Sequence, residues 1–462
     1  MPVCEKERVM RSSRKFNQAL FENLEGRTLL TGVALGLAET TYDGGTQLRI
    51  TGTNGNDQIT VKQTVAGLQI GNTGNWSKTI TDPISSIWIN GEGGNNSVVI
   101  DASVKQNCTI FGGGVNDTIS DNGAGNDTLY GGTGKNTIQA GSGNDTLVSL
   151  GSTSDTLKGG TGHDSFWTDN KTTEKIQNLT AAEASSGAVH RVSGYYNIPV
   201  VTGKTAAAKA KSAQAAAAAL AQEPGVDAGI TYASFSSDPI FSSAGPSEND
   251  IYQGQVGDCY YLSVLSSVAK VDPARISQSI LDLGNGYVLV ALNHNGSTAY
   301  VHEDESLPVY SDGTLAYAGL GAQNSTWVAL MEKAWCYVRT SVVSYDSIDS
   351  GWMDEAYSAL GGRPASTYSA TNAASLLNLN EKDLTAGQGV TFATVSGDVP
   401  DGMLSSHAYT VDSVGLNAKG VASTLTLRNP WGCGADGTGN GYITITAAQA
   451  YDAFTGMVAA NV

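Results

Sequence analysis

The chain of 462 residues carries 26 Lys and Arg against 43 Asp and Glu, a formal net charge of −17. This acidic balance argues against nucleic acid and anionic membrane surfaces as partners, because both require a basic face. The five Cys residues are too few and too scattered for a disulfide framework, and they lack the C-x-x-C pairs of a structural zinc site. No apolar run approaches the ~18 residues that are needed to span a bilayer.

The composition changes along the chain. Gly is concentrated in 44–162, which holds 24 of the 56 Gly residues, whereas 227–462 hold 8 basic and 23 acidic residues. A chain of this length favours two or three domains. We therefore expect a multidomain protein with a disordered, export-like N-terminal segment (1–39), a repeat domain (40–200), an Ala/Lys-rich linker (201–226) and a C-terminal domain (227–462).

The N-terminal segment resembles an export label. Residues 1–20 hold five Lys and Arg, and residues 24–30 (L-E-G-R-T-L-L) resemble the short L-E-x-R-x-L-L motif that opens many large exported bacterial proteins. The apolar stretch that follows is interrupted by Thr31, Gly32 and Gly36, unlike the apolar core of a signal peptide. We expect an extracellular or cell-surface location in a bacterium; the alternative is a disordered tail with a chance match.

A nine-residue repeat begins near residue 112. An acidic or amide residue recurs every nine or ten positions, at Asp117, Asp127, Asn136, Asp145, Asp155 and Asp164. This period is too short for a helical repeat and fits a parallel β-roll, in which a tight Gly-rich turn precedes a short strand with one inward apolar residue. The expected inward residues are Leu129, Ile138, Leu147, Leu157 and Phe166.

The turns resemble the G-G-x-G-x-D-x-U-x nonapeptides of RTX-type, haemolysin-like proteins. The nearest copies are residues 131–136 (G-G-T-G-K-N) and 159–164 (G-G-T-G-H-D). The resemblance implies Ca²⁺ held by turn carbonyls and by carboxylates. The implied ligands are Asp117, Asp127, Asp145, Asp155 and Asp164. The alternative is a metal-free solenoid in which Gly and Asn only supply the left-handed turn conformation.

The two edges of such a roll are not equivalent. Two nonapeptides make one coil, so turns about 18 residues apart stack on the same edge. One edge then carries Asp127, Asp145 and Asp164, and the other carries Asp117, Asn136 and Asp155. The second edge has a neutral amide at Asn136 and bulky residues, Val115 and Thr153, where Gly is expected. We therefore predict that calcium binds the first edge preferentially.

A run of Ala with three Lys occupies residues 203–222 and ends before Pro224. Ala favours helix, but this segment has no apolar face with which to dock. It predicts an exposed, semi-rigid spacer that is sensitive to proteolysis.

In the C-terminal domain, Cys259 follows a loop with two glycines (253–258, Q-G-Q-V-G-D) and begins an apolar helical pattern that stops before Asp272-Pro273. The helix dipole and the free N–H groups at a helix N-terminus lower the pKa of a thiol and favour the nucleophilic thiolate. The alternative is a buried, inert Cys.

A thiolate nucleophile needs a base and a group that orients the base. Among five His, His407 begins an alternating strand (407–414), which a turn at 417–420 joins to a second strand (423–429). Pairing about that turn makes opposed residue numbers sum to about 837. His407 then faces Asn429 or Pro430, which predicts a Cys-His-Asn arrangement.

These residues also carry a family resemblance. Residues 253–260 (Q-G-Q-V-G-D-C-Y) resemble the Q-G-x-L-G-D-C-W signature of calpain-type cysteine proteases, and 428–432 match its R-N-P-W-G. Residues 407–409 (H-A-Y) resemble its G-H-A-Y, with Ser406 in place of Gly. Residues 304–308 and 327–334 resemble the supporting motifs D-D-x-L-P and W-x-x-L-L-E-K-A. The resemblance spans about 240–455.

The resemblance implies an α+β, papain-like, two-lobe domain that cleaves polypeptides through a thioester. Cys259 would be the nucleophile, His407 the general base and acid, and Asn429 the orienting group. Gln253 would donate to the oxyanion hole beside the Cys259 backbone N–H. This makes 227–462 a calpain-like catalytic domain, and the exposed linker a candidate site of self-cleavage.

Two departures from the family pattern bear on activity and calcium. Tyr260 replaces the Trp that follows the nucleophile. Asp250 matches one ligand of the calcium site in calpain cores, but Ser325-Thr326 stand where an acidic ligand is expected, so we do not expect calcium to activate this core. Two other functions stay open: an inactive papain-like domain that binds peptides at a surface or matrix, and a transglutaminase-like acyl transferase.

Overall fold

The computed structural model describes residues 35–42, 45–72, 76–152, 154–199, 202, 205–284 and 286–462. Most of the expected N-terminal segment, residues 1–34, lies outside these ranges, as does Thr153. The described chain forms two compact units, one that ends at Ser193 and one that runs from Gly194 to Val462.

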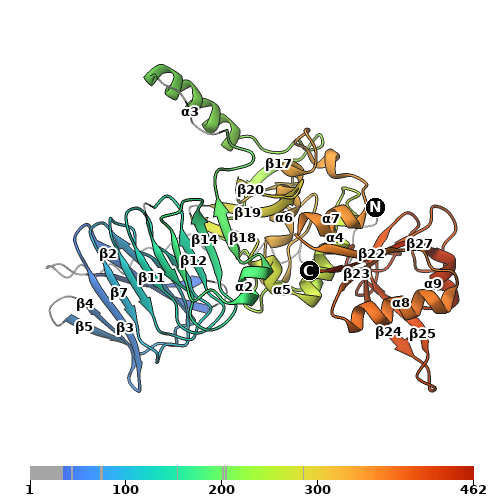
Figure 1. Ribbon diagram of the computed structural model, residues 1–462, viewed down its shortest axis with the longest axis horizontal. Coiled ribbons are helices and arrows are strands. Elements are labelled where there is room, and N and C mark those ends of the chain that lie inside the picture. The colour runs from blue at the N-terminus through green and yellow to red at the C-terminus, as the bar shows by residue number, and fades with distance from the viewer. Residues whose placement is uncertain are drawn as a thin grey trace. The chain divides into compact units, whose positions relative to one another are not determined.

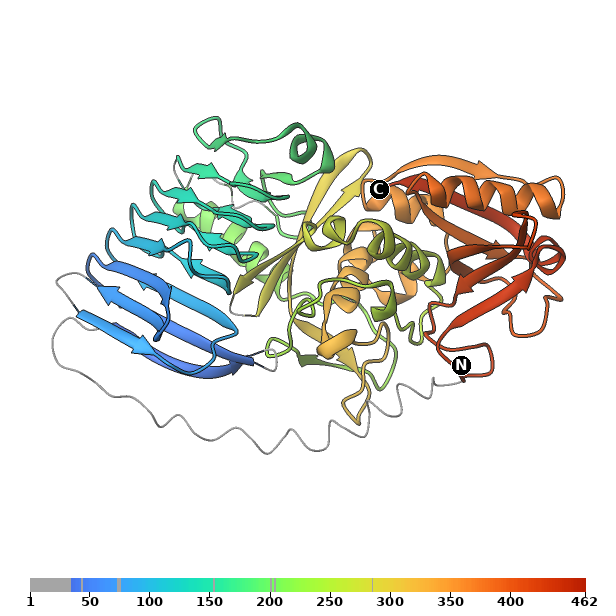
Figure 2. The same ribbon diagram turned by 90° about the horizontal axis from the view of Figure 1, so that it is seen from below.

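The first unit is a β-roll of two facing sheets (Figures 1 and 2). One sheet consists, in spatial order, of β1 (Gly36–Tyr42), β2 (Gly45–Thr53), β6 (Ser86–Glu92), β8 (Asn107–Phe111), β10 (Thr128–Tyr130), β12 (Thr146–Ser149), β14 (Ser165–Asp169) and β16 (Val189–Val192). The other consists of β15 (Lys175–Gln177), β13 (Thr156–Lys158), β11 (Thr137–Gln139), β9 (Thr118–Asp121), β7 (Ser97–Ile100), β3 (Gln58–Thr64), β4 (Gly67–Asn72) and β5 (Trp76–Ile80). From β2 and β3 to the C-terminal coils the strands run parallel, as predicted.

The nine-residue period of the sequence determines which residues of successive coils stack on one another. Leu129 pairs with Leu147, and Leu147 pairs with Phe166, so equivalent turns lie 18 or 19 residues apart on one edge. All five expected inward residues are buried, together with the Ile and Val residues of the earlier coils. At Gly143 (φ 139°) an added Cβ would lie 1.8 Å from the carbonyl oxygen of Gly125 in the preceding coil, so only Gly fits this close stacking.

The second unit has two lobes, each with its own apolar core. The first lobe comprises helices α4 (Cys259–Val271), α5 (Pro273–Ser277), α6 (Trp327–Val338) and α7 (Met353–Ala359), the three-stranded sheet β18 (Ile280–Gly284), β19 (Tyr287–His294) and β20 (Ser297–Asp304), the pair β17 (Thr231–Ser234) and β21 (Ser306–Val309), and the short 3₁₀ turns η2 (Glu248–Asp250), η3 (Ala322–Asn324) and η4 (Tyr345–Ile348). Helix α6 forms because its apolar residues pack on every side, and all twelve of its residues are buried.

The second lobe is a six-stranded antiparallel sheet in the order β22 (Arg363–Tyr368), β27 (Phe454–Asn461), β23 (Gly389–Thr394), β24 (Ala408–Leu416), β25 (Ala422–Arg428) and β26 (Tyr442–Thr446), packed with α8 (Ala373–Thr385) and α9 (Ala447–Ala453). The expected hairpin is β24–β25. The numbers of paired residues in this hairpin sum to 838 or 839, where the turn predicts about 837. The sum changes at Asp412, where β24 has a bulge. This α+β, two-lobe architecture agrees with the predicted fold class.

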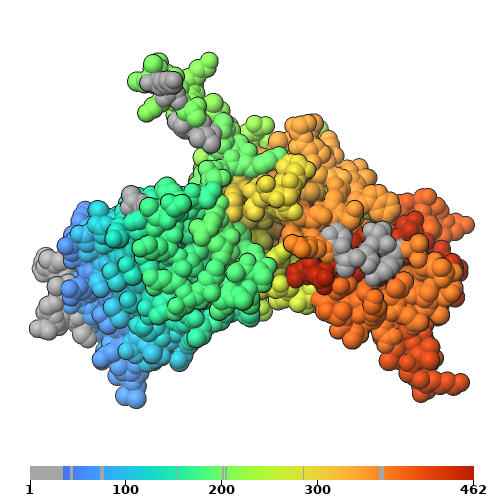
Figure 3. Space-filling model, in the orientation of Figure 1, coloured from blue at the N-terminus to red at the C-terminus, as the bar shows by residue number. Residues whose placement is uncertain are grey.

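The Ala/Lys run forms helix α3 (Ala206–Leu220), which begins at the cap Thr205 and buries none of its residues (Figure 3). The residues after it are different. Tyr337 donates a hydrogen bond to the carbonyl of Gln222, and Glu223 forms an ion pair of 2.8 Å with the buried Lys333. The exposed spacer therefore ends near Ala221 and not at residue 226. Among the described residues, no helix is long and apolar enough to cross a membrane.

Candidate active site and calcium-binding turns

Cys259 is the first residue of α4, at the place the sequence predicts. The backbone N–H of Ala408 interacts with its thiol, which puts Cys259 beside the start of β24. Tyr260, the residue that departs from the family pattern, is buried: its hydroxyl donates to the carbonyl of Ile348 and accepts from Trp335 Nε1. The substitution is thus fully accommodated next to the nucleophile.

The expectation of a lowered thiol pKa is wrong for this structure. Burial raises the pKa of Cys259 to about 11, and the neighbouring carboxyl group of Asp258 adds to the rise. The helix dipole expected from local sequence is outweighed by desolvation, because β24 covers the helix start. Burial also lowers the pKa of His407 to about 4, so thiol and imidazole are both neutral here. No hydrogen bond joins them among the described residues.

His407 and Asn429 meet as the hairpin predicts. The distance between His407 Nε2 and Asn429 Oδ1 is 2.9 Å. The amide is held in one orientation, because its Nδ2 donates to the carbonyl of Cys433 and its Oδ1 also accepts the N–H of Trp431. An amide oxygen only accepts, so Nε2 carries the proton and Nδ1 is the unprotonated nitrogen of the neutral ring. The Trp431 ring packs edge-on against the imidazole, with ring centroids 5.6 Å apart.

The backbone around His407 explains the glycine of the family motif. Ser406 has φ 50°, in the left-handed region that Gly adopts without strain. Its N–H donates to the carbonyl of Val395, and the N–H of His407 donates to Thr394 Oγ1. These hydrogen bonds hold the turn in this conformation, in which a Ser residue is less stable than Gly would be.

Gln253 lies within reach of the same loops. Its Nε2 donates to the carbonyl of Val256 at 2.8 Å, which leaves the second hydrogen of that amide nitrogen free to donate. Its backbone N–H donates to the carbonyl of Pro430, directly after Asn429. The predicted oxyanion residue is thereby tied to the loop that carries the orienting Asn.

The sequence analysis does not identify a buried pair of acids next to Cys259. Burial raises the pKa of Asp258 to about 7, and burial and the Asp258 charge hold the pKa of Glu332 well above its usual range. The Glu332 carboxyl group accepts the N–H of Ala318. Both residues stand in the recognised motifs, but they are 74 positions apart, so only the fold shows that they face each other.

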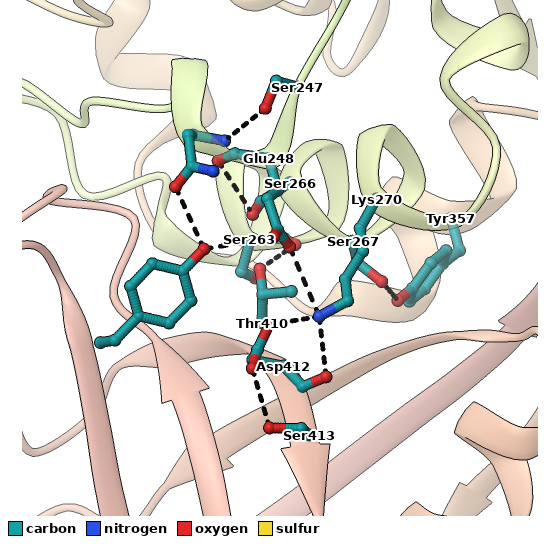
Figure 4. A network of polar contacts seen from close by, with 12 residues as sticks. Ser247, Glu248, Ser263, Ser266, Ser267, Lys270, Tyr357, Thr410, Asp412 and Ser413 are labelled. Carbon is teal, nitrogen blue, oxygen red and sulfur yellow. Dashed lines mark hydrogen bonds and ion pairs between the residues drawn. The ribbon is translucent and has the colours of Figure 1, made fainter.

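A polar network fastens the two lobes together (Figure 4). Thr410 of β24 donates to the carbonyl of Ser263 on α4 at 2.7 Å. Lys270 of α4 donates to the carbonyl of Asp412 and forms ion pairs with the carboxylates of Asp412 and Glu248. The helix that carries Cys259 is thus bonded directly to the strand that follows His407.

Asp250, the residue that matches a calpain calcium ligand, has protein partners. Its Oδ1 accepts the N–H of Ala322 at 2.9 Å, and its Oδ2 accepts from Trp327 Nε1 and from the N–H of Ser247. The carboxylate joins three segments of the first lobe, which is a structural role.

In the β-roll, the predicted ligands stack in two columns. We call Cys108, Asp127, Asp145, Asp164 and Glu183 the acidic column. In this column one carboxylate oxygen of each acid accepts the backbone N–H of the column member one coil earlier, at 2.7 to 3.1 Å. We call Asp57, Asn96, Asp117, Asn136, Asp155 and Glu174 the mixed column, which has the same ladder.

Two adjacent members of the acidic column have an unpartnered carboxylate oxygen. Asp127 Oδ2 and Asp145 Oδ2 are buried without a hydrogen-bond partner. Burial raises the pKa of Asp127 to about 8 and that of Asp145 to about 7. Buried oxygens of this kind are what Ca²⁺ requires. The donor set therefore fits the ion.

The mixed column uses amides instead. Asn136 Nδ2 donates to the carbonyls of Gly132 and Thr133 in its own turn and to Asp155 Oδ2. Asn96 Nδ2 contacts turn carbonyls in the same way. The Asn amide thus fills the space between turn carbonyls and carboxylate that a cation would fill. Two oxygens of this column, Asp57 Oδ1 and Asp117 Oδ2, are buried without a partner, and Asn96 lies between them in the ladder.

The fold and these side chains are those of a papain-like domain that follows a roll of RTX type. Comparison with known families agrees. Residues 231–440 match the model of the calpain family cysteine protease, and residues 121–151 and 149–170 match that of the RTX calcium-binding nonapeptide repeat. Both resemblances drawn from the motifs are thereby confirmed.

Individual relatives are calpains. The chain is 28% identical over 211 residues to the calpain-1 catalytic subunit of Homo sapiens, a match that covers 42% of this chain and 29% of that protein. It is 26% identical over 220 residues to calpain-B of Drosophila melanogaster (44% and 23%) and 27% identical over 215 residues to the calpain-type cysteine protease ADL1 of Oryza sativa subsp. japonica (43% and 10%). The match therefore spans between a tenth and less than a third of these relatives.

Proposed function

We propose that the domain from Gln222 to Val462 is an active cysteine endopeptidase. The observation that carries this proposal is the 2.9 Å contact between His407 Nε2 and an Asn429 amide whose orientation is fixed by two further hydrogen bonds. Such a contact keeps Nδ1 unprotonated and aimed, which a general base requires. A domain that only binds peptides has no need of it.

The proposed reaction begins from neutral groups. His407 Nδ1 takes the thiol proton of Cys259 as Sγ attacks the substrate carbonyl, and the resulting imidazolium is stabilised by Asn429. The oxyanion receives hydrogen bonds from the Cys259 N–H and from the free hydrogen of Gln253 Nε2. The imidazolium then gives its proton to the leaving amine, and water hydrolyses the thioester.

The test combines labelling with turnover. Purified protein is treated with a peptidyl epoxide and assayed on casein, with Cys259→Ala, His407→Ala, Asn429→Ala and the matched control Cys108→Ser. We expect labelling at Cys259 only, no turnover by the first two variants and reduced turnover by Asn429→Ala. Casein cleavage by Cys259→Ala would refute the assignment. Labelling without any turnover would favour a peptide-binding domain, and incorporation of a primary amine in place of hydrolysis would favour an acyl transferase.

We propose further that the β-roll binds Ca²⁺ chiefly along the acidic column, through Asp127, Asp145 and Asp164. When bound, the ion neutralises carboxylates of which two oxygens, Asp127 Oδ2 and Asp145 Oδ2, are buried without a hydrogen-bond partner. Asp117 and Asp155 would contribute less, because neighbouring Asn amides already occupy the mixed column. RTX repeats are typical of secreted bacterial proteins, so we propose an extracellular or cell-surface location, with self-cleavage in the exposed helix α3 as a route to release the peptidase.

A further inference from the structure

The first position of the acidic column is a thiol. Cys108 donates its backbone N–H to Asp127 Oδ1 at 2.7 Å, just as Asp127 donates its own to Asp145 Oδ1 at 2.8 Å. Cys108 therefore occupies the place of the ladder Asp in the preceding coil. Its side chain is buried, and its sulfur belongs to the interior of the roll.

A second acid reaches this place from the other sheet of the roll. Asp121 is the last residue of β9 and pairs with Ile100 of β7, so a carboxylate stands where the preceding coil has an apolar side chain. Asp121 is fully buried. Its Oδ1 accepts the N–H of Gly123 at 2.8 Å, whereas its Oδ2 has no hydrogen-bond partner.

The three side chains converge. Cys108 Sγ, a carboxylate oxygen of Asp121 and a carboxylate oxygen of Asp127 all lie within 4.8 Å of one another, and all three residues are buried. Asp127 Oδ2 and Asp121 Oδ2 have no hydrogen-bond partner outside this cluster. The carboxylates of Asp121 and Asp145 both disfavour the ionised form of Asp127. Buried carboxylates that repel one another are costly, and a cation between them would remove this cost.

We propose that Cys108, Asp121 and Asp127 bind one divalent ion of the zinc class. Ca²⁺ takes oxygen ligands, whereas a thiolate selects softer ions, and Zn²⁺ accepts both Cys sulfur and Asp oxygen. With bonds of about 2.3 Å to sulfur and about 2.1 Å to oxygen, the three atoms need to draw together by about 1 Å to share one ion. Binding displaces the Cys108 thiol proton to solvent. The site shares Asp127 with the proposed calcium column but adds a sulfur ligand, and it does not depend on peptidase activity.

Co²⁺ serves as the probe, because a thiolate bound to Co²⁺ gives a charge-transfer absorption band. The parent is the full chain with Cys259→Ala and Cys4→Ser, saturated with Ca²⁺. We expect a band that saturates near one equivalent of Co²⁺, persists in excess Ca²⁺ and is abolished by Zn²⁺. Cys108→Ser should abolish the band, and Asp121→Asn should weaken Co²⁺ binding by about tenfold or more. Cys336→Ser, at a buried thiol in α6, should leave the band unchanged.

Cys108→Asp separates a lost ligand from a lost fold. It restores the carboxylate of the column, so it should keep the far-UV circular dichroism and the calcium-induced rise in melting temperature while losing the Co²⁺ band. The proposal is overturned if the parent gives no band, if the band survives in Cys108→Ser or Cys108→Asp, or if Asp121→Asn binds Co²⁺ as tightly as the parent.

Discussion

Asp145 is the residue at which the calcium proposal can be tested most sharply, through Asp145→Asn. Its Oδ1 accepts the N–H of Asp127, a role that an amide oxygen can keep, and its Oδ2 is buried without a partner. The wild-type chain already has an amide at the equivalent position of another coil. There Asn136 Nδ2 donates to the carbonyls three and four residues earlier. At position 145 the equivalent carbonyls belong to Gly141 and Ser142.

The expected change in the free energy of unfolding follows from the raised pKa of Asp145. Burial lifts the pKa of Asp145 from 3.8 to about 7. At about 1.4 kcal/mol per pKa unit, ionising it in the folded roll costs up to about 4 kcal/mol. Asp145→Asn removes this cost, so the calcium-free variant should be more stable than the wild type by about 1 to 4 kcal/mol. The calcium response should shrink, since a site filled at 100 times its Kd stabilises by about 2.7 kcal/mol.

The assay is thermal unfolding of the full chain at pH 7.5, with calcium and with a chelator. The matched control is Asp155→Asn in the mixed column. Asp155 Oδ2 accepts Asn136 Nδ2, so this substitution sets two amide groups against each other. It should destabilise the calcium-free roll and leave the calcium response nearly intact. Equal calcium responses in the two variants, a calcium-free Asp145→Asn less stable than the wild type, or a wild type indifferent to calcium would refute the reasoning.

Three other predictions concern pH, backbone strain and processing. The unfolded-state carboxyls ionise near pH 4, whereas in the folded roll the pKa of Asp127 is about 8 and that of Asp145 about 7. The calcium-free melting temperature should therefore fall as pH rises from 5 to 8.5, and calcium should flatten this profile; a profile that rises instead contradicts the burial argument. Ser406→Gly should keep peptidase activity and raise stability by up to about 1 kcal/mol in denaturant titration, whereas Ser406→Val should lower it; the reverse order would mean that φ carries no strain. Incubation of the full chain should yield a fragment near half size after cleavage in α3, and the same fragment from Cys259→Ala would point to a contaminating protease.

Local sequence was sufficient where the period or the motif sets the structure. The nine-residue spacing placed Leu129, Leu147 and Phe166 in the core and stacked their turns. The hairpin turn brought His407 to Asn429, although the bulge at Asp412 shifts the register by one or two residues. Bulges depend on how a strand packs against other elements, here on the contact of β24 with α4, so turn geometry alone could not fix the register.

Features that need two distant segments could not be found from the sequence. The pKa of the Cys259 thiol depends on β24 covering the start of α4, about 150 residues later in the chain, and the dipole argument saw only the helix. Asp258 and Glu332 each match one position of a family motif, so the sequence gives no sign that the two side chains interact. The proximity of Cys108 to Asp121 was hidden in the same way, because a lone Cys in one strand and an Asp at the end of another carry no signal until the coils are stacked.

The two columns of the β-roll accommodate their buried carboxylates in different ways. In the mixed column, acids alternate with the amides Asn96 and Asn136, which supply N–H groups to turn carbonyls and to Asp155 Oδ2. Each column ends in a Glu with protein donors: Ser149 and Ser152 donate to Glu174, and Thr180 donates to Glu183. In the mixed column the unpartnered oxygens of Asp57 and Asp117 are separated by Asn96, whereas those of Asp127 and Asp145 are adjacent, so the demand for a cation is greatest along the acidic column. Removal of calcium should open that edge first, while the amide-filled edge keeps its ladder.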